Sequence, residues 1–289
     1  MAACLCGRRK GVTHSELLGV HAVAISDPYT VTILLDVNSI QDIDDRAESR
    51  TYVVADSDSG KAVIIDSVIE NVERDLKTID ELGLTLIYAI ETHIHADHIT
   101  GASMIKDRTG SKIVFGGGAK GTVTGADMFL HEGQELRFGN TTIKALATPG
   151  HTDSCTSYFL PGAVFTGDTL FIRSNGRTDL QDGSSDKLFD SVRKKLFMLP
   201  DSTIVFPGHD YNGRVSSTIG EEKQFNERLN LSIDKKAFVE VMNNQRKPRP
   251  VKMGIAIPAN LRAGRVAGEE AGVNLGHHSA LQLDQNLRL

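Results

Sequence analysis

Apolar side chains recur along this chain with two spacings, which separate its expected strands from its expected helices. Short apolar runs at residues 51–55 and 61–66, on either side of a turn at 56–60, predict two strands of a hairpin. Val68, Val72, Leu76 and Ile79 follow at helical spacing and predict a helix over 68–82. The continuous apolar run at 84–90 predicts a buried strand.

The rest of the chain continues this mixture of strands and helices. A helix is expected to end at residue 109, and the strands that follow are expected at 112–115, 135–138, 141–147, 156–160, 163–165 and 203–206. Helical spacing recurs at 186–198, 218–229 and 234–244, whereas residues 1–30 and those beyond 252 show no regular pattern. Because strands and helices do not alternate strictly, the pattern predicts a layered α/β sandwich.

Net charge, apolar runs and cysteine content indicate which partners and which cell compartment to expect. The 289 residues carry a formal net charge of −5, which gives no support for a nucleic acid or an anionic membrane as partner. No apolar run approaches the ~18 residues of a membrane helix. The three cysteines, Cys4, Cys6 and Cys155, form no Cys-x-x-Cys pair. Such sparse use is typical of a reducing compartment, so we expect a cytoplasmic protein, with Cys155 a small packed residue.

Histidines and aspartates gather in four short motifs, each just after an expected strand. The motifs are His93-Ile94-His95-Ala96-Asp97-His98, Pro149-Gly150-His151, Thr166-Gly167-Asp168 and Pro207-Gly208-His209. Imidazole and carboxylate groups are ligands of zinc, iron and manganese, and loops at strand ends are where scaffolds place reactive groups. The glycines that precede three of these residues permit tight turns that aim the next side chain. The four motifs together therefore predict a metal site.

These motifs resemble those of a known superfamily. His-x-His-x-Asp-His followed by Gly-His-Thr, Thr-Gly-Asp and Gly-His-Asp is similar to the signature of the metallo-β-lactamase superfamily. The stretches T-H-I-H-A-D-H-I-T-G, F-T-G-D-T-L-F-I-R, G-R-T-D-L-Q, P-G-H-D-Y and I-P-A-N-L-R further resemble the persulfide dioxygenases. The resemblance implies an αββα sandwich of two mixed sheets flanked by helices. It implies a catalytic domain at 31–265, between an N-terminal extension at 1–30 and a tail at 266–289.

The resemblance also implies roles for individual residues. The ligands of a single Fe(II) fall on His93, His151 and Asp168, a face that leaves positions for dioxygen and a substrate sulfur. The family's catalytic groups, which orient the ligands and hold protons, fall on His95, Asp97, His98 and His209. Groups that could bind the substrate fall on Arg177, Asp179, Tyr211 and Arg262.

The implied reaction converts glutathione persulfide and O₂ to sulfite and glutathione. Two alternatives stay open at this point. One is a dinuclear zinc thioesterase of the glyoxalase II type, because all seven potential ligands are present. The other is a non-enzymatic module with a structural metal, which the lack of a nearby cysteine ligand disfavours. The resemblance leaves a homodimer open and points to the mitochondrial matrix if the protein is eukaryotic.

Overall fold

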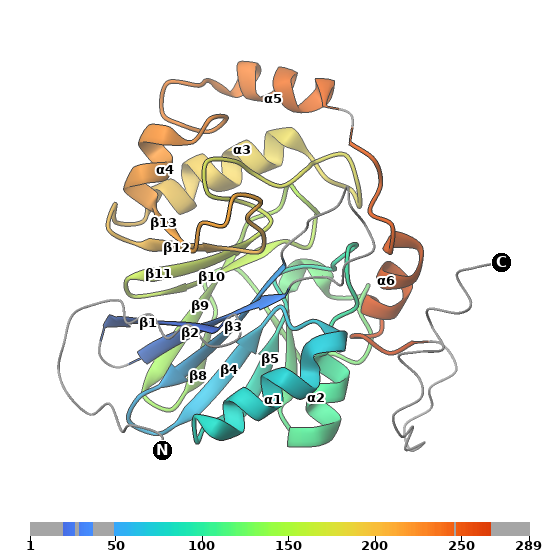
Figure 1. The fold of residues 1–289 in the computed structure, drawn as a ribbon. Coiled ribbons are helices and arrows are strands. Elements are labelled where there is room, and N and C mark those ends of the chain that lie inside the picture. Colours follow the sequence, from blue (N-terminus) through green and yellow to red (C-terminus); the bar gives the residue numbers. More distant parts are fainter. Residues whose placement is uncertain (1–19, 27–28, 37–48, 246, 267–289) are drawn as a thin grey trace.

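Two β-sheets packed face to face form the centre of the protein, and helices cover both outer faces (Figure 1). This architecture comes from a computed structural model, which describes residues 20–26, 29–36, 49–245 and 247–266. Cys4, Cys6 and the tail at 267–289 lie outside the described residues. The predicted αββα sandwich is confirmed. No helix in the described part of the chain has both the length and the apolar character needed to cross a bilayer.

The first sheet contains seven strands arranged in the order of the sequence. The strands are β1 (Val20–Ser26), β2 (Tyr29–Asp36), β3 (Ser49–Asp56), β4 (Lys61–Ile65), β5 (Thr85–Ile90), β6 (Lys112–Gly116) and β7 (Met128–Leu130). Strands β1 to β4 pair antiparallel, and β4 to β7 pair parallel. The sheet is therefore mixed, and β4 and β5 end side by side, with Ile65 opposite Ile90.

The second sheet contains six strands in the order β13-β12-β11-β10-β9-β8. They are β8 (Glu135–Phe138), β9 (Thr141–Ala147), β10 (Thr156–Leu160), β11 (Ala163–Gly167), β12 (Ile204–Pro207) and β13 (Ser217–Thr218). In the described part of this sheet only β11 and β12 pair parallel, and Gly167 lies opposite Pro207. Two of the motif-bearing loops therefore leave the sheet side by side.

Helices α1 (Val72–Glu81) and α2 (Ala102–Thr109) cover the first sheet, and α3 (Ser185–Lys194), α4 (Ile219–Phe225) and α5 (Lys235–Asn244) cover the second (Figure 1). Short 3₁₀ turns occur at Ile69–Asn71, Gly117–Ala119 and Leu196–Met198, and α6 (Met253–Asn260) follows α5. Ser184, Thr218 and Asp234 begin their helices by accepting a hydrogen bond from a backbone N–H three residues later.

Alternation along the central strands divides the apolar residues among three layers. In β3, Tyr52 and Val54 face the second sheet, whereas Val53 and Ala55 pack beneath α1 and α2. In β11, Phe165 faces the first sheet, and Val164 joins the layer under α3 and α5. Each central strand is thus buried on both faces, which explains the near-continuous apolar runs in the sequence.

Several elements differ from the sequence-based prediction. Strand β1 lies within residues 1–30, where no element was predicted, so the sheet begins earlier than expected. The boundaries at 31 and 265 stay predictions. The helix predicted at 218–229 ends at Phe225, because Asn226 turns out of the helix and its side chain accepts from Arg228 N and Leu229 N. The helix predicted at 186–198 ends at Lys194 and gives way to a 3₁₀ turn.

Helix α6 falls in the region that was predicted to be irregular. Its sequence, M-G-I-A-I-P-A-N, has no polar face and contains Pro258, so helical spacing gave no signal. Ala256 and Ala259 pack against Ile99, just after the histidine motif. Tertiary contact therefore decides this helix, and the contact places its last residue, Asn260, beside the motif-bearing loops.

Candidate metal centre

The loop that follows β5 carries His93, His95, Asp97 and His98, and a side chain from α6 fixes its course. Asn260, which is buried, donates from Nδ2 to His95 O at 2.9 Å and to His98 O at 2.8 Å. Its Oδ1 accepts from Thr100 N at 2.9 Å. Three bonds from one amide hold both ends of the histidine turn, so the loop has little freedom to rearrange.

The loop after β9 presents His151. Gly150 adopts a φ of +147°, and an added Cβ would collide with the backbone of Leu188 at the start of α3. Only glycine fits this close approach. Nδ1 of His151 donates to Arg177 O at 2.7 Å, so Nε2 keeps its lone pair. That lone pair is available to a metal.

The loops after β11 and β12 present Asp168 and His209. Gly167 has a φ of +48°, and Gly208 lies so close that an added Cβ would be 2.5 Å from Oδ1 of Asp168. A backbone bond from Gly208 N to Gly167 O, 2.8 Å long, joins the two loops. The result is a bond of 2.8 Å between Nδ1 of His209 and Oδ1 of Asp168.

His93, His151 and Asp168 converge from three separate loops. One potential ligand atom of each lies within 4.8 Å of the others. Nε2 of His151 is 3.5 Å from Oδ2 of Asp168, and the rings of His93 and His151 meet edge to face at 4.9 Å. All three residues are buried, with 2%, 8% and 8% of their surface exposed. Two imidazoles and one carboxylate therefore form a compact set of metal donors.

A relay of hydrogen bonds fixes the tautomer of His93. Oγ1 of Thr92 donates to Oδ2 of Asp66 at 2.7 Å, so this oxygen accepts from Nδ1 of His93, which is 2.9 Å away. The relay leaves the lone pair on Nε2. Burial, followed by the charge of His95, lowers the pKa of His93 well below its usual value, so the ring stays neutral. Both histidines of the set therefore present a free lone pair.

The carboxylate of the set is ionised. Burial opposes its charge, but the charge and hydrogen bond of His209, with further contributions from His151 and His93, lower the pKa of Asp168. Burial also opposes a charge on His209, yet Asp168 and Asp97 raise its pKa well above the usual value. Asp168 and His209 thus form a buried ion pair, with the carboxylate available as an anionic ligand.

A second group of donors lies beside the first. Oδ2 of Asp97 is 3.0 Å from Nδ1 of His98 and 3.2 Å from Nε2 of His209. The hydroxyl of Ser49 contacts the same Oδ2 at 3.1 Å and the same Nε2 at 3.2 Å. Nε2 of His98 is buried and has no hydrogen-bond partner among the described residues.

The ring of His95 lies 4.0 Å from that of His93 and 4.2 Å from that of His98, and its Nε2 points to two buried acids. Its Nε2 lies 3.2 Å from Asp66 Oδ1 and 3.3 Å from Glu91 Oε2. Burial opposes a charge on the ring, but these two carboxylates raise the pKa of His95 well above its usual value. His95 is therefore an ion-paired support of the loop.

Comparison with known proteins identifies the family. Residues 45–209 match the model of the metallo-beta-lactamase superfamily, a range that contains all four motifs. The chain belongs to the metallo-β-lactamase superfamily.

Relatives within the superfamily include persulfide dioxygenases. The chain is 43% identical to mouse mitochondrial persulfide dioxygenase ETHE1 over 219 residues, which cover 74% of this chain and 84% of the mouse protein. The human protein of the same name is 42% identical over the same shares. The crystal structure of ETHE1 from Myxococcus xanthus superposes with a TM-score of 0.72 at 43% identity, covering 75% of this chain and 95% of that one. The chain is therefore a member of the persulfide dioxygenase family.

The four residues predicted to bind the substrate of this family lie in different surroundings. The guanidinium group of Arg177 contacts other residues of this chain. Its Nε and Nη2 donate to the carboxylate of Asp179 at 2.7 and 2.8 Å. Its Nη1 and Nη2 donate to the backbone oxygens of Pro248 and Lys247. This arrangement is that of an arginine that ties two loops together. The backbone oxygen of the same residue orients His151, so the loop still belongs to the site.

Tyr211 and Arg262 are both exposed, but they contact different parts of the protein. The ring of Tyr211 stacks on His209 at 6.2 Å and is 58% exposed, so it borders the site from the open side. Arg262 is exposed and donates from Nε to Arg265 O. Its position follows Asn260 by two residues, at the end of α6.

Sequence reasoning missed several residues that build the site. Ser49, Asp66, Glu91 and Thr92 support the histidines, yet none belongs to a ligand type at a diagnostic spacing. Two more had a signal: Asn260 lies in I-P-A-N-L-R and Gln181 in G-R-T-D-L-Q, and Gln181 Nε2 donates to Ile94 O at 2.8 Å. These motifs were associated with the substrate, but they also hold the histidine loop.

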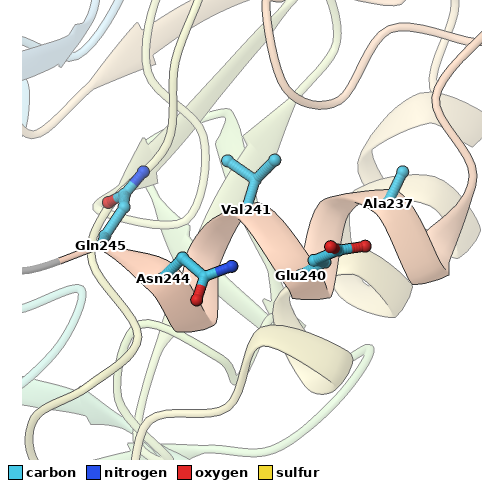
Figure 2. A pocket seen from close by; sticks show the side chains of 5 residues that line it. All are labelled: Ala237, Glu240, Val241, Asn244 and Gln245. Atoms are coloured by element: carbon cyan, nitrogen blue, oxygen red, sulfur yellow. The ribbon is translucent and has the colours of Figure 1, made fainter.

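A surface depression lies apart from this chemistry. It has a volume of about 450 Å³ and lies on α5 (Figure 2), lined by Ala237, Glu240, Val241, Asn244 and Gln245. None of the histidines or aspartates of the four motifs lines it. The donor set is instead held in the buried edge of the sandwich, where the strand ends meet.

Proposed function

We propose that this protein is a sulfur dioxygenase that oxidises glutathione persulfide with O₂ to sulfite and glutathione, and that one Fe(II) per chain is bound by His93, His151 and Asp168. The observation that supports the proposal is the three-donor set in a chain 43% identical to a persulfide dioxygenase. Relatives under that name cover most of the chain, whereas a glyoxalase II-type thioesterase has weaker support.

The donors suit a ferrous ion. Two neutral imidazoles and one carboxylate are the ligand types of non-haem Fe(II) oxygenases, in which the remaining positions are left for reactants. The hydrogen bonds of Thr92 and of Arg177 O present Nε2 of both histidines, and such partners strengthen ligand binding. The chemistry that Fe(II) supplies when bound is the activation of O₂ next to the persulfide sulfur.

The protein's own contribution is to hold the reactants and the protons. Burial of all three donors limits the access of water, and the fixed loops keep the donors in place without rearrangement. His209, hydrogen-bonded to Asp168 and Asp97, holds a proton at the edge of the set. His95, Asp97 and His98 orient their neighbours in this proposal, as the family resemblance implies.

The substrate is proposed to approach from the side of Tyr211, the exposed aromatic ring next to His209. Arg177 and Asp179 pair with each other next to His151, and Arg177 also holds residues 247 and 248. Arg262 is the remaining charged candidate for a carboxylate of glutathione. We propose a location in the mitochondrial matrix if the protein is eukaryotic, and otherwise in the cytoplasm, with a homodimer to be tested by light scattering.

The decisive experiment combines metal analysis with oxygen uptake on the full chain purified without oxygen. We expect close to one iron per chain, little zinc, and uptake of O₂ with formation of sulfite when glutathione persulfide is added. His93→Ala, His151→Ala and Asp168→Ala should each lose iron and activity together, because three donors have no spare member. His209→Ala should lose activity while part of the iron is retained.

His131→Ala is the matched control, because it removes an imidazole that lies outside the four motifs. It should keep both iron and turnover. Two zinc ions per chain with hydrolysis of S-lactoylglutathione would refute the dioxygenase and favour the thioesterase.

A further inference from the structure

Ser49 contacts the metal centre from strand β3, which carries none of the four motifs. It is the first residue of β3, and its backbone forms an isolated antiparallel bridge with His209. The next residue strengthens this pairing through a bond of 3.0 Å from Arg50 N to Gly208 O. Backbone pairing therefore fixes the position of the Ser49 side chain, which is 2% exposed.

The hydroxyl of Ser49 lies between two atoms that a second metal ion would need. His95, Asp97, His98 and His209 are the residues that would bind a second ion in dinuclear hydrolases of this fold, as the family resemblance implies. Nε2 of His98 has no hydrogen-bond partner in the part of the chain that the structure describes. Oδ2 of Asp97 and Nε2 of His209, in contrast, each contact the Ser49 oxygen, at 3.1 and 3.2 Å.

The direction of these hydrogen bonds follows from the single hydrogen of a hydroxyl. Ser49 donates that hydrogen to Oδ2 of Asp97. Its oxygen then accepts from Nε2 of His209, which must carry a hydrogen and has no lone pair for a metal. Oδ2 of Asp97 also contacts Nδ1 of His98 at 3.0 Å and Nε2 of His209 at 3.2 Å, so three neighbours occupy its lone pairs.

We propose that Ser49 is a specificity-determining residue that keeps the centre mononuclear, because its hydroxyl contacts Oδ2 of Asp97 and Nε2 of His209, two donor atoms that a second ion would need. The inference rests on the proposed single-iron function and adds its structural cause.

The test is metal stoichiometry, which needs no activity measurement. Metal-free full-length protein is titrated with Co(II) and with Zn(II) by calorimetry, and bound metal is counted after gel filtration. Wild type should bind one ion tightly. Ser49→Ala and Ser49→Gly should bind a second ion at least tenfold more tightly than wild type does, whereas Ser49→Thr, which keeps the hydroxyl, should remain at one.

Ser103→Ala is the matched control. Ser103 is also a buried serine, and its hydroxyl donates to Ala263 O at 2.6 Å instead of to a residue of the four motifs. It should bind one ion. Thermal melts show whether each variant is folded. If Ser49→Ala does not fold, Ser49→Gly takes its place in the titration.

Each outcome bears on one claim. A single tight ion in wild type and in both hydroxyl-free variants would overturn the role of Ser49 and leave the proposed function standing. A second ion gained equally by Ser103→Ala would also overturn it. Two tight ions in wild type would contradict the single-iron function itself.

Discussion

Thr92 offers the sharpest test of how the protein prepares its histidines for a metal. Its hydroxyl donates to Asp66 and accepts from Nδ1 of His93, and both bonds are buried. Thr92→Val replaces the hydroxyl by a methyl group of similar size. The change removes the relay while it leaves the backbone bond from Thr92 N to Asp66 Oδ1, at 2.7 Å, in place.

The size of the effect follows from the groups left without partners. Loss of a hydrogen-bond partner behind a metal-binding histidine typically weakens metal binding about 10- to 100-fold. That range corresponds to about 1.4–2.7 kcal/mol of binding free energy. The buried Nδ1–H of His93 also loses its acceptor, which costs about 1–3 kcal/mol of folding stability. We therefore expect a raised Kd for Fe(II) and a lowered Tm.

The assay is an anaerobic competition titration with a chromophoric chelator, followed by thermal melts. Thr92→Ser keeps the hydroxyl and should bind Fe(II) nearly as wild type does. Thr141→Val is the matched control, because Thr141 is a buried threonine that donates to Asp56 at 2.8 Å in the hairpin of β9. It should lower Tm with no change in Kd. An unchanged Kd for Thr92→Val would refute the reasoning that the relay sets the tautomer of His93.

Three further predictions follow from other contacts. Asn260→Ala loses all three bonds to the histidine loop and should lower both iron content and Tm, and a normal iron content in the folded variant would contradict the anchoring role. Burial raises the pKa of Cys155 from 9.0 to about 12, so iodoacetamide at pH 8 should label this cysteine only after denaturation, as read by peptide mass spectrometry. The pKa of this thiol is higher in the folded protein than in the unfolded chain, so the thiol should lower the free energy of unfolding as the pH rises from about 9 toward 12. The same pH series with Cys155→Ala should lack this loss. Arg177→Lys should lower Tm with normal iron because an ammonium cannot copy the paired contact with Asp179, whereas a raised KM at unchanged Tm would assign Arg177 to the substrate.

The sequence by itself determined the donor set and most of the sandwich. Donor chemistry is carried by residue type, so histidines and aspartates after apolar strands were recognisable without coordinates. Strands buried on both faces show as apolar runs, which located β3 to β5 and β9 to β12. The glycines before His151 and Asp168 likewise predicted tight turns, and both have the positive φ that favours glycine.

Only the tertiary structure decided how those donors are supported. Thr92, Asp66, Asn260 and Ser49 act through hydrogen bonds to residues that are mostly far away in the chain, up to 165 positions in the case of Asn260 and His95. Such polar residues are common and carry no periodic signal, and their importance depends on burial, which the fold creates. Helix α6 shows the same limit, because Pro258 argues against a helix locally and packing against Ile99 overrides it. The candidate donors can therefore be recognised from the sequence, whereas their tautomers depend on which distant side chains the two sheets bring together.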